Sequence, residues 1–178
     1  MSSSSKNKLV EEIKNDLFSG DDVVVMKAVL KCKDQDSVTF VEPLIAVYAS
    51  TGMSEIRREV ADLLNNIKVP NAEQAFLKAL ANKQNVKIRK DILSFIWNSG
   101  IQPVDQIVDL TEIAIDGSFE EALECLTIIE NIEDQVPEEI ILESVSVLRS
   151  AISNQPNDPK TGLLADLLSV LESRTEEF

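Results

Sequence analysis

Apolar residues recur at three- and four-residue spacing along almost the whole chain, which is the pattern of amphipathic helices. Glycine, proline and acidic residues divide this pattern into about ten segments, and no segment requires a β-strand. The first predicted helix covers residues 7–18 and the second begins at 21. Four pairs follow: 38–50 with 54–67, 71–82 with 85–99, 103–115 with 118–132, and 137–153 with 158–173. The sequence therefore predicts an all-α protein.

The second helices of these pairs repeat one another. Residues 56–66 return with small changes at 88–98, and a third copy follows at 121–131. Self-similarity at a period of 32 to 33 residues is typical of repeat architectures. Positions that are apolar in all three copies are predicted to form the core: Val60, Ile92 and Cys125, then Leu64, Ile96 and Ile129. Positions that are polar in all copies are predicted to form an outward stripe: Glu59, Asp91 and Glu124, then Asp62, Ser94 and Thr127.

Helix boundaries are marked at the same period. Pro70, Pro103 and Pro137 each stand where a helix pair begins, and proline suits the first turn of a helix because it lacks an N–H group. Residues 118–121 form a capping box in which a serine and a glutamate each bond a backbone N–H group of the first turn. We expect left-handed residues in the joints at Gly52, Gly100 and Gly117.

Nothing in the chain marks a boundary between two globular units, so we expect a single repeat domain over residues 8–174. Residues 1–7 are predicted to be a disordered tail, and residues 172–178 a fraying end.

No apolar run approaches the length of about 18 to 20 residues that spans a bilayer, and the N-terminal segment lacks the apolar core of a secretory signal. We therefore expect a cytoplasmic protein with no membrane partner, in which Cys32 and Cys125 are reduced core residues.

Charge changes this picture more than overall composition does. The chain carries 31 acidic and 17 basic residues, for a formal net charge of −14. No lysine or arginine occurs in residues 91–148, which contain 14 acidic residues, whereas the rest of the chain has 17 of each sign. The sequence thus predicts a polarised molecule whose acidic part repels nucleic acid.

The residues at 41–64, and again at 73–98, resemble HEAT repeats. Pro43 matches a proline that often bends the first helix of that repeat, and Ile56-Arg57 and Ile88-Arg89 match the dipeptide that opens its second helix. The resemblance implies a right-handed α-α superhelix, a solenoid of about five antiparallel helix pairs. It also implies a structural inter-repeat role for Arg57 and Arg89, whose equivalents bond carboxylates and loop carbonyls between adjacent repeats. The third copy departs from the pattern, with Ala122 in place of the arginine, and the period is shorter than in eukaryotic HEAT proteins.

Catalytic chemistry finds little support in the sequence. The chain has no histidine, which removes histidine-based catalytic triads and imidazole metal sites. The glutamates at 120, 121 and 124, and at 138, 139 and 143, share helix faces and could hold a divalent cation, but such runs are more often solvated surface. We expect no enzyme, no cofactor and no metal. A catalytic, lyase-type, or small-ligand-binding HEAT-like protein is the alternative.

Our favoured hypothesis is a non-enzymatic scaffold or adaptor that offers an acidic curved surface to a protein or peptide partner, with a basic partner favoured. Trp97 is the leading candidate contact, because the repeat places polar residues at its position: Asn65 before it and Glu130 after it. The alternative for Trp97 is a side chain folded over the nearby core. The other candidate contacts are the polar residues of the outward stripe and the acids of the third copy: Asp62, Ser94, Glu120, Glu124 and Glu130. The partner's identity, the pathway and the oligomeric state are left open by the sequence.

Overall fold

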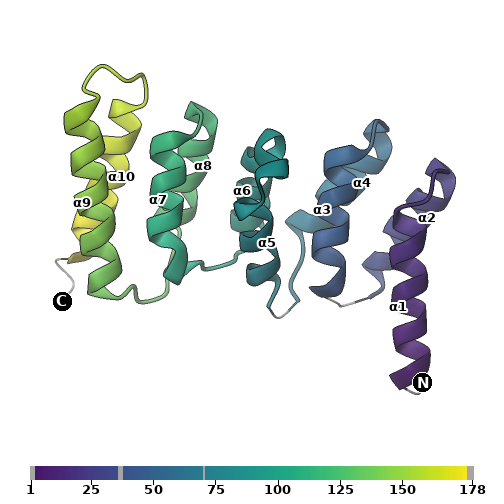
Figure 1. Ribbon diagram of the computed structural model, residues 1–178. Helices are drawn as coiled ribbons and strands as arrows, with labels where there is room; N and C mark the ends of the chain where they lie inside the picture. The colour runs from purple at the N-terminus through teal and green to yellow at the C-terminus, as the bar shows by residue number, and fades with distance from the viewer. Residues whose placement is uncertain (1–2, 36–37, 70, 176–178) are drawn as a thin grey trace. The chain divides into compact units, whose positions relative to one another are not determined.

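A computed structural model describes residues 3–35, 38–69 and 71–175. Within these ranges every regular element is a helix, and the ten α-helices are accompanied by three short 3-10 helices (Figure 1). The all-α prediction is therefore confirmed. Pro70, one of the three periodic prolines, lies outside the described residues.

The chain consists of two compact units, residues 1–99 and residues 100–178. The division falls inside the range 8–174 for which the sequence predicts a single domain, and that assignment stays a prediction.

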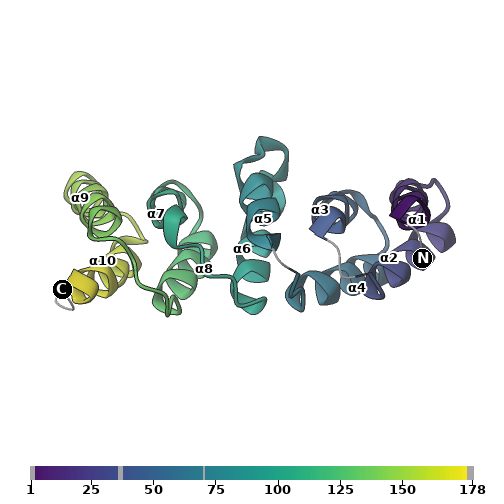
Figure 2. The same ribbon diagram turned by 90° about the horizontal axis from the view of Figure 1, so that it is seen from below.

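Three helix pairs make up the first unit, and their members form two layers (Figure 2). In one layer α1 packs on α3 and α3 packs on α5, while in the other α2 packs on α4 and α4 packs on α6. Two 3-10 helices, Val38–Phe40 and Lys83–Ile88, precede α3 and α6. The six α-helices are α1 (Ser3–Leu17), α2 (Asp22–Lys33), α3 (Val41–Ser50), α4 (Ser54–Asn65), α5 (Ala72–Ala81) and α6 (Arg89–Asn98).

The second unit repeats the same plan with two pairs. Its first helices, α7 and α9, pack on each other, and so do its second helices, α8 and α10 (Figure 2). A 3-10 turn at Val104–Gln106 leads into α7. The α-helices are α7 (Ile107–Asp116), α8 (Phe119–Glu130), α9 (Glu138–Asn154) and α10 (Thr161–Thr175).

Two helix ends differ from the prediction. The first helix begins at Ser3, inside the segment 1–7 that was assigned to a tail, because each residue added to an established helix gains a backbone hydrogen bond. At the other end α10 continues to Thr175, beyond residue 172 where fraying was expected, and residues 176–178 lie outside the described part of the chain.

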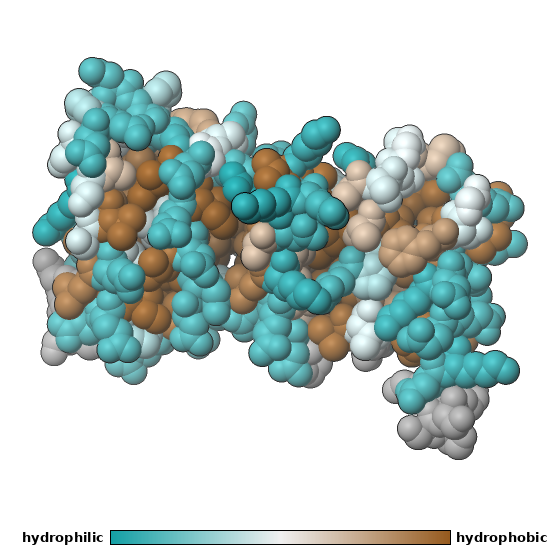
Figure 3. All heavy atoms as spheres, in the orientation of Figure 1, coloured by the Kyte–Doolittle hydropathy of each residue, from teal (hydrophilic) through white to brown (hydrophobic). Residues whose placement is uncertain are grey.

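The repeated apolar columns form the core of each unit. Val60 and Leu64 in α4, Ile92 and Ile96 in α6, and Cys125 and Ile129 in α8 are all fully buried. Burial of a large aliphatic side chain stabilises the fold by about 1.5 to 3 kcal/mol, so these columns supply much of the packing energy between pairs. On the face seen in Figure 3, hydrophilic side chains cover much of the outward surface of the helices and hydrophobic ones lie between them.

An asparagine ends each of the three repeated helices. Asn66, Asn98 and Asn131 donate from Nδ2 to the carbonyl oxygen four residues back, at 2.8, 2.9 and 2.8 Å respectively. The last turn of a helix has more carbonyls than backbone N–H donors, so a side-chain donor at this position adds a bond where the backbone supplies few. The recurrence of asparagine in the sequence repeat therefore has a structural cause.

Two cations, Lys160 just before α10 and Arg174 within it, cap other helices in the second unit. The Lys160 ammonium is buried and donates to the carbonyl oxygens of Ala114 at 3.1 Å, Gly117 at 2.7 Å, and Ile115, where α7 ends. The Arg174 guanidinium donates to the carbonyls of Ile129 at 2.9 Å and Ile132 at 2.8 Å, where α8 ends. Both positive charges also lie at the negative end of a helix dipole. In the first unit Lys68 donates in the same way to the Ser99 carbonyl that follows α6.

The joint between α7 and α8 is closed by local contacts. The predicted capping box is confirmed: the Ser118 N–H donates to Glu121 Oε2 at 2.7 Å, and the Glu121 N–H donates to Ser118 Oγ at 3.2 Å. Gly117 precedes it with a φ of −83°, so the expected left-handed conformation is wrong there. It is also wrong at Gly52, whereas Gly100 does adopt it with a φ of 71°. Glycine is needed at 117 for space, because a Cβ atom would stand 2.5 Å from Glu121 Oε2 and 2.6 Å from the Ile113 carbonyl oxygen.

Replacing Lys160 by methionine should lower the free energy of unfolding by about 2 to 4 kcal/mol, because buried carbonyls at the end of α7 lose their donor. The urea midpoint of the variant measures this loss. Arg149→Ala is the matched control: it removes an exposed ion pair with Glu172 (2.7 Å) in the same unit and should cost less than about 1 kcal/mol. Equal losses in the two variants would contradict the capping role of Lys160.

Gly117→Ala should destabilise the protein by about 1 to 3 kcal/mol, since Glu121 and the backbone at Ile113 must move to admit the methyl group. The same substitution at Gly52, where a Cβ atom would meet nothing within 4 Å, should change stability by no more than about 1 kcal/mol. Thermal unfolding followed by circular dichroism compares the two. A tolerated alanine at 117 would show that the joint can relax.

Candidate partner-binding surface

The candidate contacts of the first unit lie on α4 and α6, which pack side by side. Trp97 is 41% exposed near the end of α6, which agrees with the outward position that the repeat predicts for it. Asp62 on α4 is exposed, and Ser94 on α6 is half-buried. The carbonyl groups of both residues accept the asparagine bonds that end their helices, so this stripe also serves the fold.

Arg57 lies in a cluster that joins two neighbouring helix pairs. Its guanidinium carbon stands 4.7 Å from the centre of the Tyr48 ring, which belongs to α3 of the same pair. The Tyr48 ring in turn makes a T-shaped contact with Phe95 from α6, with ring centres 5.3 Å apart and an interplanar angle of 86°. Cation–π and edge-to-face contacts of this kind each contribute about 0.5 to 2 kcal/mol. This arrangement gives Arg57 a cation–π contact, whereas the family resemblance implies bonds to carboxylates and carbonyls. Arg89, the other arginine to which the resemblance assigns that role, is half-buried at the first residue of α6.

The Asp91 carboxylate interacts with Tyr48 of the same cluster. Burial raises the pKa of the Tyr48 phenol above its ordinary value of 10.0, and the negative charge of Asp91 and a hydrogen bond with its carboxylate raise this pKa further. The positive charge of Arg57 acts in the opposite direction. Asp91, which the sequence places on the outward stripe, is half-buried and faces this internal tyrosine. Sequence reasoning missed Tyr48, because it lies on a first helix outside the repeated columns.

The acidic candidates of the second unit all lie on α8. Glu120 and Glu130 are exposed, and Glu124 is half-buried. They share this helix with the buried Glu121 of the capping box, so only some of the acids in this run are solvated.

The charge asymmetry of the sequence follows the two units. Residues 1–99 carry 14 basic and 13 acidic residues, while residues 100–178 carry 3 basic and 18 acidic residues. The three basic residues of the second unit are Arg149, paired with Glu172, and the helix-capping Lys160 and Arg174. Twelve acids described in this unit are exposed: Asp105, Asp109, Glu112, Asp116, Glu120, Glu130, Glu133, Asp134, Glu138, Glu139, Glu143 and Asp166. The surface of this unit is therefore strongly negative, and its cations serve internal contacts.

Chemistry at the cysteines and carboxylates is limited. Both cysteines are buried and neither forms a disulfide, and burial raises the pKa of Cys32 to about 12, so this thiol stays protonated at neutral pH. Among the described residues, no group of three histidine, cysteine, aspartate or glutamate side chains converges to hold a metal ion.

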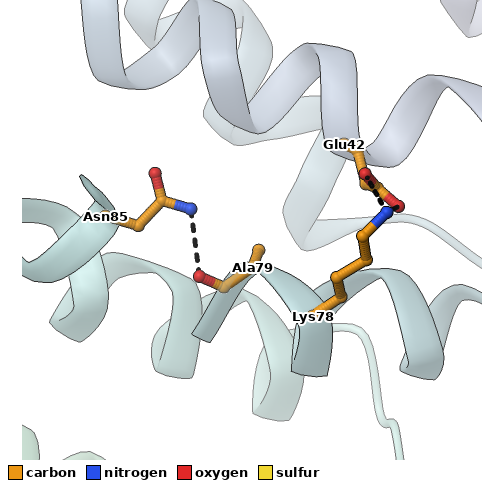
Figure 4. Close-up of polar contacts among 4 residues, drawn as sticks. All are labelled: Glu42, Lys78, Ala79 and Asn85. Carbon is orange, nitrogen blue, oxygen red and sulfur yellow. Dashed lines mark hydrogen bonds and ion pairs between the residues drawn. The ribbon is translucent and has the colours of Figure 1, made fainter. Parts of the chain in front are cut away.

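A cleft of about 640 Å³ lies between α3 and α5 in the first unit. Figure 4 shows two of its contacts: Lys78 Nζ bonds both carboxylate oxygens of Glu42 at 2.9 Å, and Asn85 Nδ2 donates to the Ala79 carbonyl at 3.0 Å. The hydroxyl of Ser50 likewise donates to the Ala46 carbonyl at 2.8 Å. These polar groups bond other groups of the protein, so their contacts stabilise the walls of the cleft.

A second cleft, of about 400 Å³, lies beside the ends of α2 and α4 and is lined mainly by apolar side chains such as Phe40, Leu44 and Leu63. Its rim carries Lys33, which stands 4.0 Å from Glu59, and Lys68, which is bonded to Ser99. These two lysines already have partners in the first unit.

Comparisons of the chain with protein-family models, with curated proteins and with solved structures find no match. In the described part of the chain, no helix has the length and apolar character needed to cross a bilayer.

Because Tyr48 is the only tyrosine, its titration can be followed by tyrosinate absorbance in the native protein. The midpoint should lie above 10, and Asp91→Asn should lower it by removing a charge and an acceptor that favour the neutral phenol. Arg57→Ala should raise it. The raised native pKa stabilises the fold below pH 10, and this stabilisation is lost as pH rises through the native midpoint.

Asp62→Asn is the control for this titration, since it removes an exposed carboxylate from the helix next to α6 and should leave the midpoint unchanged. A titration midpoint that changes in neither Asp91→Asn nor Arg57→Ala would show that these two charges do not act on Tyr48 as described.

Proposed function

We propose that this protein is a non-enzymatic protein-binding scaffold, built as an α-α superhelix of HEAT-like repeats, whose second unit presents an acidic surface to a basic protein or peptide. The observation that carries the proposal is the charge of the second unit, where twelve exposed acids face solvent and all three cations are engaged in internal contacts.

The layered packing of helix pairs within each unit supports the repeat architecture. Neighbouring pairs bury the same columns of the sequence repeat, and first helices pack on first helices while second helices pack on second helices. Repeat proteins of this kind expose a large surface relative to their mass and use it for binding. The carboxylates of that surface would attract a basic partner over a distance of about a Debye length and speed its association.

In the first unit's clefts, Lys78, Asn85 and Lys33 interact with groups of the protein itself, and this favours a binding surface over a catalytic pocket. Two buried cysteines that form no disulfide accord with a reducing compartment, so the proposal includes a cytoplasmic location.

Synthetic peptides of about 18 residues, equal in length and basic, neutral or acidic in charge, test the proposal by biolayer interferometry. The protein should bind the basic peptides, with an association rate that falls severalfold between about 0.15 and 1 M salt as the Debye length shrinks from about 8 to 3 Å. Reversal of Glu120, Glu124 and Glu130 to lysine should slow this association.

The matched control reverses three exposed acids of the first unit, Glu12, Asp34 and Glu55, and should have a smaller effect at the same net charge. Circular dichroism checks that both triple variants remain helical. Equal association rates for basic and acidic peptides, without dependence on salt, would refute the proposal and leave the acidity a matter of solubility.

A further inference from the structure

Large apolar side chains on the second unit's surface are concentrated on one helix. Three such side chains described in this unit are exposed by more than 40%: Phe119 by 49%, Leu123 by 46% and Leu142 by 53%. The first two lie on α8 four residues apart, so they stand about 6 Å from each other along the helix axis on the same side.

This exposed side of α8 forms a continuous stripe. Phe119, Leu123, Thr127 and Glu130 follow one another at three- and four-residue spacing, and we call them the α8 stripe. Thr127 is half-buried and the other three are exposed. The opposite side of α8 is buried in the unit through Ala122, Cys125, Ile128 and Ile129. The stripe is therefore the solvent face of a helix that is otherwise packed.

The sequence repeat shows that an apolar residue is unusual here. Position 123 corresponds to Arg58 and Lys90 in the two preceding copies, both of which are exposed cations. Leu123 leaves 46% of its surface exposed where the two preceding copies place cations, and together with Phe119 it forms an apolar patch on α8. The substitution also removes a positive charge from the acidic unit.

Carboxylates accompany the apolar pair. Glu120 stands next to Phe119 on α8, and Glu130 ends the stripe, about 10 Å along the axis from Leu123. The guanidinium of Arg174, which reaches the end of α8, is bonded to the Ile129 and Ile132 carbonyls. The α8 stripe therefore combines apolar anchors with negative charge that the unit's own cations leave available.

We propose that the α8 stripe is the docking site of a basic amphipathic helix, an inference that rests on the proposed function above. Charge complementarity selects the partner: lysines or arginines flanking an apolar row would meet Glu120 and Glu130 while the row covers Phe119 and Leu123. Helix-on-helix packing suits the spacing, and α8, at 12 residues, offers three turns of contact. Anionic membrane surfaces and nucleic acids are repelled by the same carboxylates.

Two peptides of identical composition test the inference with the full-length protein. Both are lysine-rich and about 18 residues long. One places leucines at i, i+3, i+4 and i+7 on a single helix face, and the other distributes them around the helix. The wild-type protein should bind the amphipathic peptide about tenfold or more tightly than its scrambled counterpart, because only the former aligns its leucines with Phe119 and Leu123.

The double variant Phe119→Ser and Leu123→Ser should lose this preference while keeping the salt-dependent attraction to both peptides. Leu142→Ser, which removes a leucine of similar exposure from α9, is the control and should keep the preference. Leu123→Lys provides a second variant, because it restores the residue type of the two preceding copies and should fold as the wild type does. It should also lower the affinity for the amphipathic peptide.

The outcomes separate this inference from the proposed function. Salt-dependent binding of basic peptides with no preference for the amphipathic one, or a preference that survives in the Phe119 and Leu123 variants, overturns the docking site and leaves the acidic scaffold standing. No binding of any basic peptide overturns both. Sedimentation analysis adds one more outcome: a wild-type dimer that the double variant converts to monomer would make a second copy of this chain the occupant.

Discussion

Every helix ends with carbonyl groups that its own backbone cannot bond, and a stack of short helix pairs has many such ends. This constraint shapes much of the structure. Asparagines close α4, α6 and α8 with a local bond, while α6, α7 and α8 also receive cations from outside, namely Lys68, Lys160 and Arg174. In the second unit, this use of cations at helix ends also affects the charge of the surface. Two of its three basic residues are committed to carbonyl oxygens, so the carboxylates on its surface have few internal counterions. The requirement that helix ends be satisfied thus links the fold to the surface proposed for binding.

Periodic and local features were predictable from the sequence. The core columns, the helix pairs and the capping box at Ser118 and Glu121 each depend on residues within a few turns or at a fixed repeat spacing. These features follow from helical periodicity and capping chemistry, which act over short stretches of chain.

Long-range contacts could not be predicted in this way. Lys160 bonds a carbonyl 46 residues earlier in the chain, and Tyr48 meets Phe95 across two helix pairs, so no local spacing identifies either contact. Gly117 looked like a left-handed residue, but the crowding that requires glycine there comes from Glu121 folding back in its capping box. Of the candidate contacts, the exposure of Trp97 and Glu130 followed from the column that they share in the repeat. The apolar part of the α8 surface was missed, because position 123 belongs to no column that is apolar or polar in all three copies: Leu123 follows Arg58 and Lys90.

The contacts of Lys160 and Arg174 also affect the order in which the second unit can fold during synthesis. Residues 114 to 117 and 129 to 132 leave the ribosome more than 40 residues before the side chains that bond their carbonyls. At typical rates of about 5 to 20 residues per second, α7 and α8 wait a few seconds without the bonds from these two side chains. Completion of this unit therefore depends on the C-terminal end of the chain, and a nascent chain that stalls before α10 would lack the contacts that close both helices.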